Sequence, residues 1–196
     1  MWAGGTVAIL ASGESMTAEV AQTVRAAGVF TIAVNNTWEM AFWADLLFAG
    51  DAPWWEMHHK KLGGFSGIKV CAEETPFPDV RFVRPTGKVG FDPDPSCIRT
   101  GGNSGYGAMH VAAHAGAARL LLFGFDMQGG HWHDPHPWPL YQGDGGHFPR
   151  WIARFKVLAA ELAALGIEVL NCTPGSAIAC FPRADINDVL GINHGH

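Results

Sequence analysis

The sequence predicts a single α/β domain, a Rossmann-like parallel sheet with helices on both faces. Short apolar runs alternate with helical patterns along most of the chain. The apolar runs end at small or polar residues, as strands do when they lead into a ligand-binding edge. The length of 196 residues is that of one ordinary domain and shows no internal repeat, so residues 1–196 are predicted to form one unit.

The first quarter of the chain reads as strand, turn, helix and two further strands. Thr6–Ala11 is apolar and is followed by a Ser-Gly-Glu-Ser turn, after which Ala18–Ala27 has apolar residues at helical spacing. Phe30–Val34 and Leu46–Ala49 have the length of buried strands. A polar residue follows each predicted strand, namely Ser12, Asn35 and Asp51.

The segment from Leu62 to Arg99 is rich in Gly, Pro and isolated charges and has no strong helical pattern. β-like pieces occur at Ile68–Cys71 and Val80–Val83. We therefore expect an irregular excursion with one or two strands.

Regular structure resumes at Ser104, where a small polar loop runs into an Ala-rich helix. The strand Arg119–Gly124 follows and leads into a Gly-Phe-Asp sequence. Residues 126–147 then form a long stretch rich in Gly, Pro, His and Trp, and loops of this length are usually functional or mobile. A helix is predicted over Phe148–Leu165 and a strand over Ile167–Asn171.

Composition excludes several classes of protein. Thirteen Lys and Arg against 18 Asp and Glu give a net charge of -5, which argues against binding duplex nucleic acid. The four cysteines have no paired spacing, so neither a zinc cluster nor a disulfide framework is predicted. The N-terminus shows no signal peptide or membrane span, which predicts a cytoplasmic protein. The eight tryptophans fit core packing, an aromatic-lined pocket or a homo-oligomer interface.

Several segments at the predicted strand ends and helix start share an order with a known family. They are Ala11-Ser12-Gly13-Glu14-Ser15, Val34-Asn35-Asn36, Asp51-Ala52-Pro53, Ser104-Gly105, Phe123-Gly124-Phe125-Asp126 and Cys172-Thr173-Pro174-Gly175-Ser176. In this order the chain resembles the bacterial sialyltransferase family, which uses a cytidine monophosphate-sialic acid donor, and related prophage proteins of unknown function. The resemblance covers most of the chain, and the ungapped block from Ser104 to Asp126 is its strongest part.

The resemblance implies a sialyltransferase-like fold, a nucleotide-sugar donor as co-substrate and no obligatory cofactor. It implies a donor site formed by Ser12, Gly13, Ser15, Asn35, Asn36, Asp51, Ser104, Gly105 and Gly124. His147, before the last long helix, matches the family's catalytic base. The chain departs from the family where the middle Asn of the first loop is absent, where Asp51 stands in place of an Asn, and where no phosphate-binding tyrosines follow Asp126.

The residue types suit glycosyl transfer with inversion, which needs a base for the acceptor proton and groups that stabilise the departing phosphate. His147 could be that base because imidazole accepts protons near neutral pH, although a surface histidine before a helix is the alternative. Asp126 could bind a ribose or position an acceptor hydroxyl, or it could be a turn residue. Gly13, Ser15 and Ser104 could offer donors to phosphate, and turn formation explains them as well.

The His131–Pro137 segment is the most unusual local composition in the chain. His131, His133 and His136 could contact phosphate or acceptor in place of the missing tyrosines, hold a divalent metal, or belong to a structural loop. Alternate residues share one face of a strand, so His131 and His133 could bind one metal. Two other functions therefore stay open: a metal-dependent phosphoester or pyrophosphate hydrolase, and a non-enzymatic phage accessory protein with a vestigial crevice.

Overall fold

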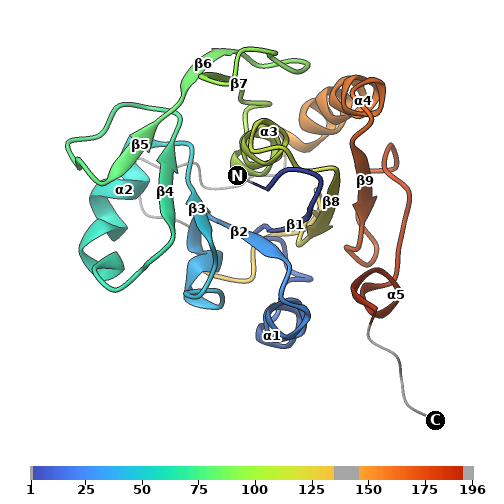
Figure 1. Cartoon of the computed structure of the whole chain (residues 1–196), viewed down its shortest axis with the longest axis horizontal. Helices are drawn as coiled ribbons and strands as arrows, with labels where there is room; N and C mark the ends of the chain where they lie inside the picture. The colour runs from blue at the N-terminus through green and yellow to red at the C-terminus, as the bar shows by residue number, and fades with distance from the viewer. Residues whose placement is uncertain (1, 135–145, 192–196) are drawn as a thin grey trace.

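The computed structural model describes residues 2–134 and 146–191. These residues form a seven-stranded sheet in the order β5-β4-β3-β2-β1-β8-β9, and every neighbouring pair of strands is parallel (Figure 1). The strands are β1 Thr6–Leu10, β2 Phe30–Val34, β3 Leu46–Phe48, β4 Ile68–Cys71, β5 Val80–Phe82, β8 Arg119–Phe123 and β9 Glu168–Asn171. The predicted Rossmann-like α/β fold is confirmed.

Helices cover both faces of the sheet (Figure 1). The helices α3 and α4 lie on one face, and α1, α2 and α5 lie on the other. Their bounds are α1 Ala18–Ala27, α2 Ala52–His58, α3 Ser104–His114, α4 Phe148–Ala164 and α5 Ile186–Leu190, with 3-10 helices η1 Asn35–Glu39 and η2 His59–Leu62. None of the helices in the described parts of the chain is long and apolar enough to cross a membrane.

The alternation of side chains along each strand divides the core into two layers. In β1, Val7 and Ile9 face the layer beneath α3 and α4, where Phe155 is also fully buried. Ala8 and Leu10 face the opposite layer, beneath α1 and α2. Strands buried on both faces read as continuous apolar runs, and this explains why the central strands could be recognised from the sequence.

The excursion between residues 62 and 99 is more regular than its composition predicts. β4 and β5 extend the main sheet as parallel strands, and a second sheet forms from β6, Arg84–Gly87, and β7, Cys97–Arg99. β6 was missed because its sequence, Arg-Pro-Thr-Gly, is largely exposed and carries no apolar signal.

Contacts with α3 hold the segment between β6 and β7 against the main sheet. Tyr106 Oη donates to the carbonyl of Gly90 at 3.1 Å and lies 2.9 Å from the Gly90 nitrogen. His110 Nε2 accepts from the Asp92 N–H at 3.2 Å, and the Phe91 ring stacks on the imidazole at 4.7 Å. Burial lowers the pKa of His110 to about 4, so this fully buried histidine is neutral in the folded protein at neutral pH.

The buried His110 predicts an acid-sensitive fold. Between pH 6.5 and about 4 the unfolded chain binds a proton at His110 that the folded chain does not, so the free energy of unfolding should fall as pH falls through this window. The lowering of the His110 pKa from 6.5 to about 4 corresponds to roughly 3 kcal/mol of unfolding free energy, which is lost across this pH window. His110→Gln keeps an acceptor for the Asp92 N–H and removes the titrating group, and urea unfolding at several pH values should give a flatter profile for this variant.

Other histidines, including His58 and His114, have pKa values lowered mainly by burial. The free energy of unfolding of His110→Gln will therefore still depend on pH, but less steeply than that of the wild type. Gln22→Ala, at an exposed and uncharged position of α1, leaves every titrating group in place, so it is the control and should keep the wild-type profile. An unchanged slope in His110→Gln would contradict the role of the buried imidazole.

Candidate functional site

The order of the strands creates a switch point between β1 and β8. The chain builds the sheet outward from β1 through β2 to β5, then returns and places β8 on the other side of β1. Connections on either side of such a point lead away in opposite directions, which opens a crevice at the carboxyl ends of the strands. The loops after β1 and β8 meet at this position.

These two loops are joined by hydrogen bonds. Gly13 N–H donates to the Gly124 carbonyl at 2.9 Å. The Asp126 carboxylate accepts from the Ser15 hydroxyl at 2.8 Å and from the Ser15 N–H at 3.2 Å. A Cβ at Gly13 would lie 1.9 Å from Asp126 Oδ2, so only glycine allows this approach. Burial raises the pKa of Asp126, and the two Ser15 bonds oppose that rise.

A cavity of about 390 Å³ lies where the loops after β1 and β8 meet, and we call it the inner cavity. Its walls come from the loops after β1, β2, β3 and β8, the start of α3 and the first turns of α4. Of the residues predicted from the sequence, it is lined by Ser12, Gly13, Asn35, Asp51, Ser104, Gly105, Gly124, Asp126, His131 and His147. The crevice therefore brings together most of the predicted site.

The start of α3 offers hydrogen-bond donors to the inner cavity. Asn103 caps the helix, because its Oδ1 accepts from the Tyr106 N–H at 2.9 Å. The N–H groups of Ser104 and Gly105 have no partner among the described residues, as is usual in a first helical turn. Asn103 Nδ2 is buried and also lacks a partner in residues 2–134 and 146–191. Such a group of donors at a helix N-terminus suits an anion.

Basic side chains add to this preference for anions. Lys88, Arg150 and Arg154 line the inner cavity. Arg154 is held in place by a hydrogen bond of 2.6 Å from its Nη1 to the Gly101 carbonyl. With the helix start, these cations give one side of the cavity a positive field.

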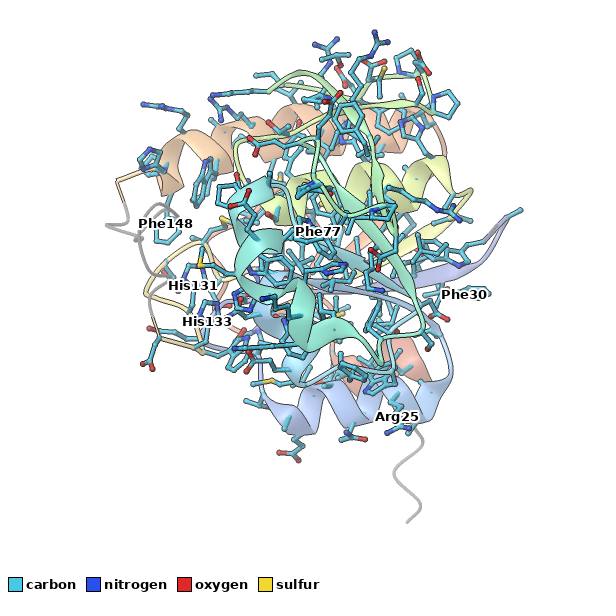
Figure 2. The ribbon with its side chains drawn as sticks, turned by 90° about the vertical axis from the view of Figure 1, so that its left-hand side faces the viewer. Arg25, Phe30, Phe77, His131, His133 and Phe148 are labelled. Carbon is cyan, nitrogen blue, oxygen red and sulfur yellow. The ribbon has the colours of Figure 1, made fainter. Side chains whose placement is uncertain are left out.

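The two predicted histidine groups approach the cavity from different elements. His147 directly precedes α4, and its ring lies 5.7 Å from the Trp151 ring. His131 lines the cavity from the loop after β8. Its ring stacks on that of His133, with 5.1 Å between the ring centroids (Figure 2). Partial burial lowers the pKa of His131, and the neighbouring His133 adds to the effect.

Some predicted residues have structural partners instead of lining the cavity. Ser15 is bonded to Asp126, and Asn36 Oδ1 accepts from Trp54 Nε1 at 2.8 Å. His133 is not among the lining residues and lies near His58, whose pKa is lowered by burial, by Lys61 and by His133. His136 lies outside the described residues.

Sequence reasoning missed several lining residues that carry polar or aromatic groups. Asn103 could have been found, since Asn is a favoured N-cap residue immediately before a helix. Arg150 and Arg154 are spaced four apart and so share a helix face next to His147. No local signal indicated that Trp54 and Lys88, from α2 and the segment after β6, reach the same place.

A metal centre has no support in the part of the chain that the structure describes. Across residues 2–134 and 146–191 there is no group of three or more His, Cys, Asp or Glu side chains arranged to hold a metal ion. His131 and His133 are adjacent, but no third such side chain completes a set with them in this range.

Comparison of the sequence with models of protein families and with curated proteins gave no match. The class of the protein therefore rests on its own fold and crevice. Both define a Rossmann-like α/β protein with a candidate anion-binding site at its switch point.

The close approach at Gly13 predicts a large effect of a single methyl group. Gly13→Ala would force the loops after β1 and β8 apart and should reduce the free energy of unfolding by about 1–3 kcal/mol. Denaturant unfolding measures this loss. Gly63→Ala is the matched control, because a Cβ there meets nothing within 4 Å, and its backbone is in the helical region at φ -58°. Equal losses in both variants would contradict the steric argument.

Proposed function

We propose that this protein is a glycosyltransferase-like enzyme that transfers a sugar, with inversion, from a nucleotide-activated donor of the cytidine type to an acceptor hydroxyl. One observation carries the proposal: the inner cavity at the switch point is lined both by the unpartnered N–H groups of α3 and by His147. An anion site and a general base thus face the same space. The cytidine type of the donor is suggested by the resemblance of the sequence segments.

The start of α3 suits the phosphate of the donor. The N–H groups of Ser104 and Gly105 and the ammonium of Lys88 would stabilise the negative charge that grows on the phosphate as its bond to the sugar breaks. Such preorganised donors need no covalent chemistry from the protein. They also supply stabilisation without an obligatory metal.

The loops after β1, β2 and β8 suit the nucleoside. Ser12 is fixed, since its hydroxyl donates to the Val34 carbonyl at 3.2 Å, so its backbone is held at the cavity wall. Asn35 is held in the left-handed region at φ 48°, a conformation that Asn tolerates better than most residues. Phe148 and Trp151 line the same cavity and offer aromatic faces to a base.

The proposed reaction is a direct displacement. The acceptor oxygen forms a bond to the anomeric carbon, the bond from that carbon to the phosphate oxygen breaks, and the acceptor proton moves to the imidazole of His147. Histidine suits this step because it exchanges protons near neutral pH. The donor leaves as a nucleotide, and the new glycosidic bond has the opposite configuration.

The alternative of a metal-dependent hydrolase rests on the segment around His131 and His133. It has less support, because no metal-binding group forms in residues 2–134 and 146–191, and His136 falls outside them. A non-enzymatic role would leave the arrangement of the α3 donors and His147 in one cavity without an explanation.

The role of His147 predicts a separation of binding from catalysis. His147→Ala should lower the rate of nucleotide release from the donor by about 10²–10⁴-fold, since the variant lacks the proton acceptor. Nucleotide affinity should change much less, because the phosphate site lies at α3. Turnover is followed by release of free nucleotide, and affinity by calorimetry on the same preparations.

A histidine substitution away from the crevice serves as the control. His59→Ala removes an imidazole that is paired with Asp79 at 2.7 Å and does not line the inner cavity, so turnover should stay at the wild-type level. Full turnover in His147→Ala would remove His147 from the proposed mechanism.

A further inference from the structure

A second cavity, of about 460 Å³, adjoins the inner cavity, and we call it the outer cavity. The two share lining residues at their junction, among them Asp51, Lys88 and Ser104. Beyond the junction the outer cavity extends to the ends of β3 and β4 and is bordered by the β6–β7 segment. Both volumes fall within the range of about 300–1,000 Å³ that is usual for small-molecule sites.

The outer cavity differs from the inner one in its charge. Its lining includes the carboxylates of Asp51 and Glu73, and Lys88 at the junction is its only cation in residues 2–134 and 146–191. Glu73 is oriented by a hydrogen bond of 2.8 Å from the Ala52 N–H to its Oε2, which leaves Oε1 for other donors. Partial burial raises the pKa of Asp51, and the charge of Glu73 adds to that rise.

Asn103, the N-cap residue of α3, lies where the two cavities meet. Asn103 lines both cavities, and its buried Nδ2 has no partner among the described residues. Lys88 and the first turn of α3 therefore supply hydrogen-bond donors at the junction, and the carboxylates of Asp51 and Glu73 supply acceptors to the outer cavity.

We propose that the outer cavity holds the sugar of the donor, and that this sugar is neutral and rich in hydroxyl groups. The inference rests on the proposed function. With the phosphate at the junction, its two substituents point to opposite sides: the nucleoside enters the inner cavity, where Phe148 and Trp151 lie, and the sugar enters the outer one. Sugar hydroxyls then donate hydrogen bonds to Asp51 and Glu73.

An acidic sugar would fit this cavity poorly. Its carboxylate would lie beside those of Asp51 and Glu73, and like-charge repulsion would disfavour binding, although both protein side chains are exposed to solvent. Lys88 could offset only one of these charges, and at the junction it also faces the donor phosphate. The carboxylates thus select against an acidic donor as well as for hydroxyl groups.

The test compares nucleotides with and without a sugar by isothermal titration calorimetry in the presence of EDTA. The probes are CMP with CMP-sialic acid, and CDP with CDP-glucose. We expect CDP-glucose to bind at least about tenfold more tightly than CDP, since hydrogen bonds to charged acceptors are among the stronger ones. CMP-sialic acid should bind no more tightly than CMP.

A charge-neutral variant separates the carboxylates from the shape of the cavity. Glu73→Gln keeps an oxygen for the Ala52 N–H and removes the charge. The variant should therefore lose most of the additional affinity that CDP-glucose has over CDP, while its affinity for CDP stays the same. Glu74→Gln, at the neighbouring exposed position outside both cavities, is the matched control and should keep the gain.

Three results would overturn the inference while the proposed function stands, and two of them need only the wild-type protein. One is a tighter complex with CMP-sialic acid than with CMP, and the other is nucleotide binding with no gain from glucose. A gain that is equal in wild type and Glu73→Gln would also overturn it. Failure of all four probes to bind would instead contradict the proposed function itself.

Discussion

The site depends on the contact between the loops that follow β1 and β8. Asp126 reaches across the switch point to Ser15, and it can do so only because Gly13 has no side chain at the crossing. This contact fixes the floor of the inner cavity. A larger residue at Gly13 would move the two loops apart and change the cavity that they share with α3.

Charge divides the crevice into two parts with different chemistry. Arg150 and Arg154 line only the inner cavity and Glu73 lines only the outer one, while Lys88, Asp51 and the start of α3 lie where the two cavities meet. A ligand with a phosphate at its centre and a neutral polyol at one end would match this pattern. The β6–β7 segment that borders the outer cavity is itself held by buried contacts with Tyr106 and His110, so α3 supports both parts.

Much of the fold could be predicted because its central strands are buried on both faces and appear as apolar runs. The bounds of α1 were predicted to the residue, since Thr17 caps its start and Gly28 ends it in the left-handed conformation. The short α2 and the strand β6 could not be predicted, because neither carries enough apolar periodicity. Several residues that line the inner cavity could be predicted because polar residues follow strands, but Lys88 and Trp54 reach it through tertiary packing that no local pattern encodes.

The central claim is that the crevice binds a nucleotide, and thermal unfolding of the purified protein with mono- and diphosphates of cytidine, uridine, guanosine and adenosine tests it most directly. A ligand that binds only the native state raises its stability. We expect cytidine monophosphate to raise the melting temperature in EDTA, and the other monophosphates to do so less. No shift with any nucleotide would contradict the claim, and a shift only with divalent metal would favour the hydrolase.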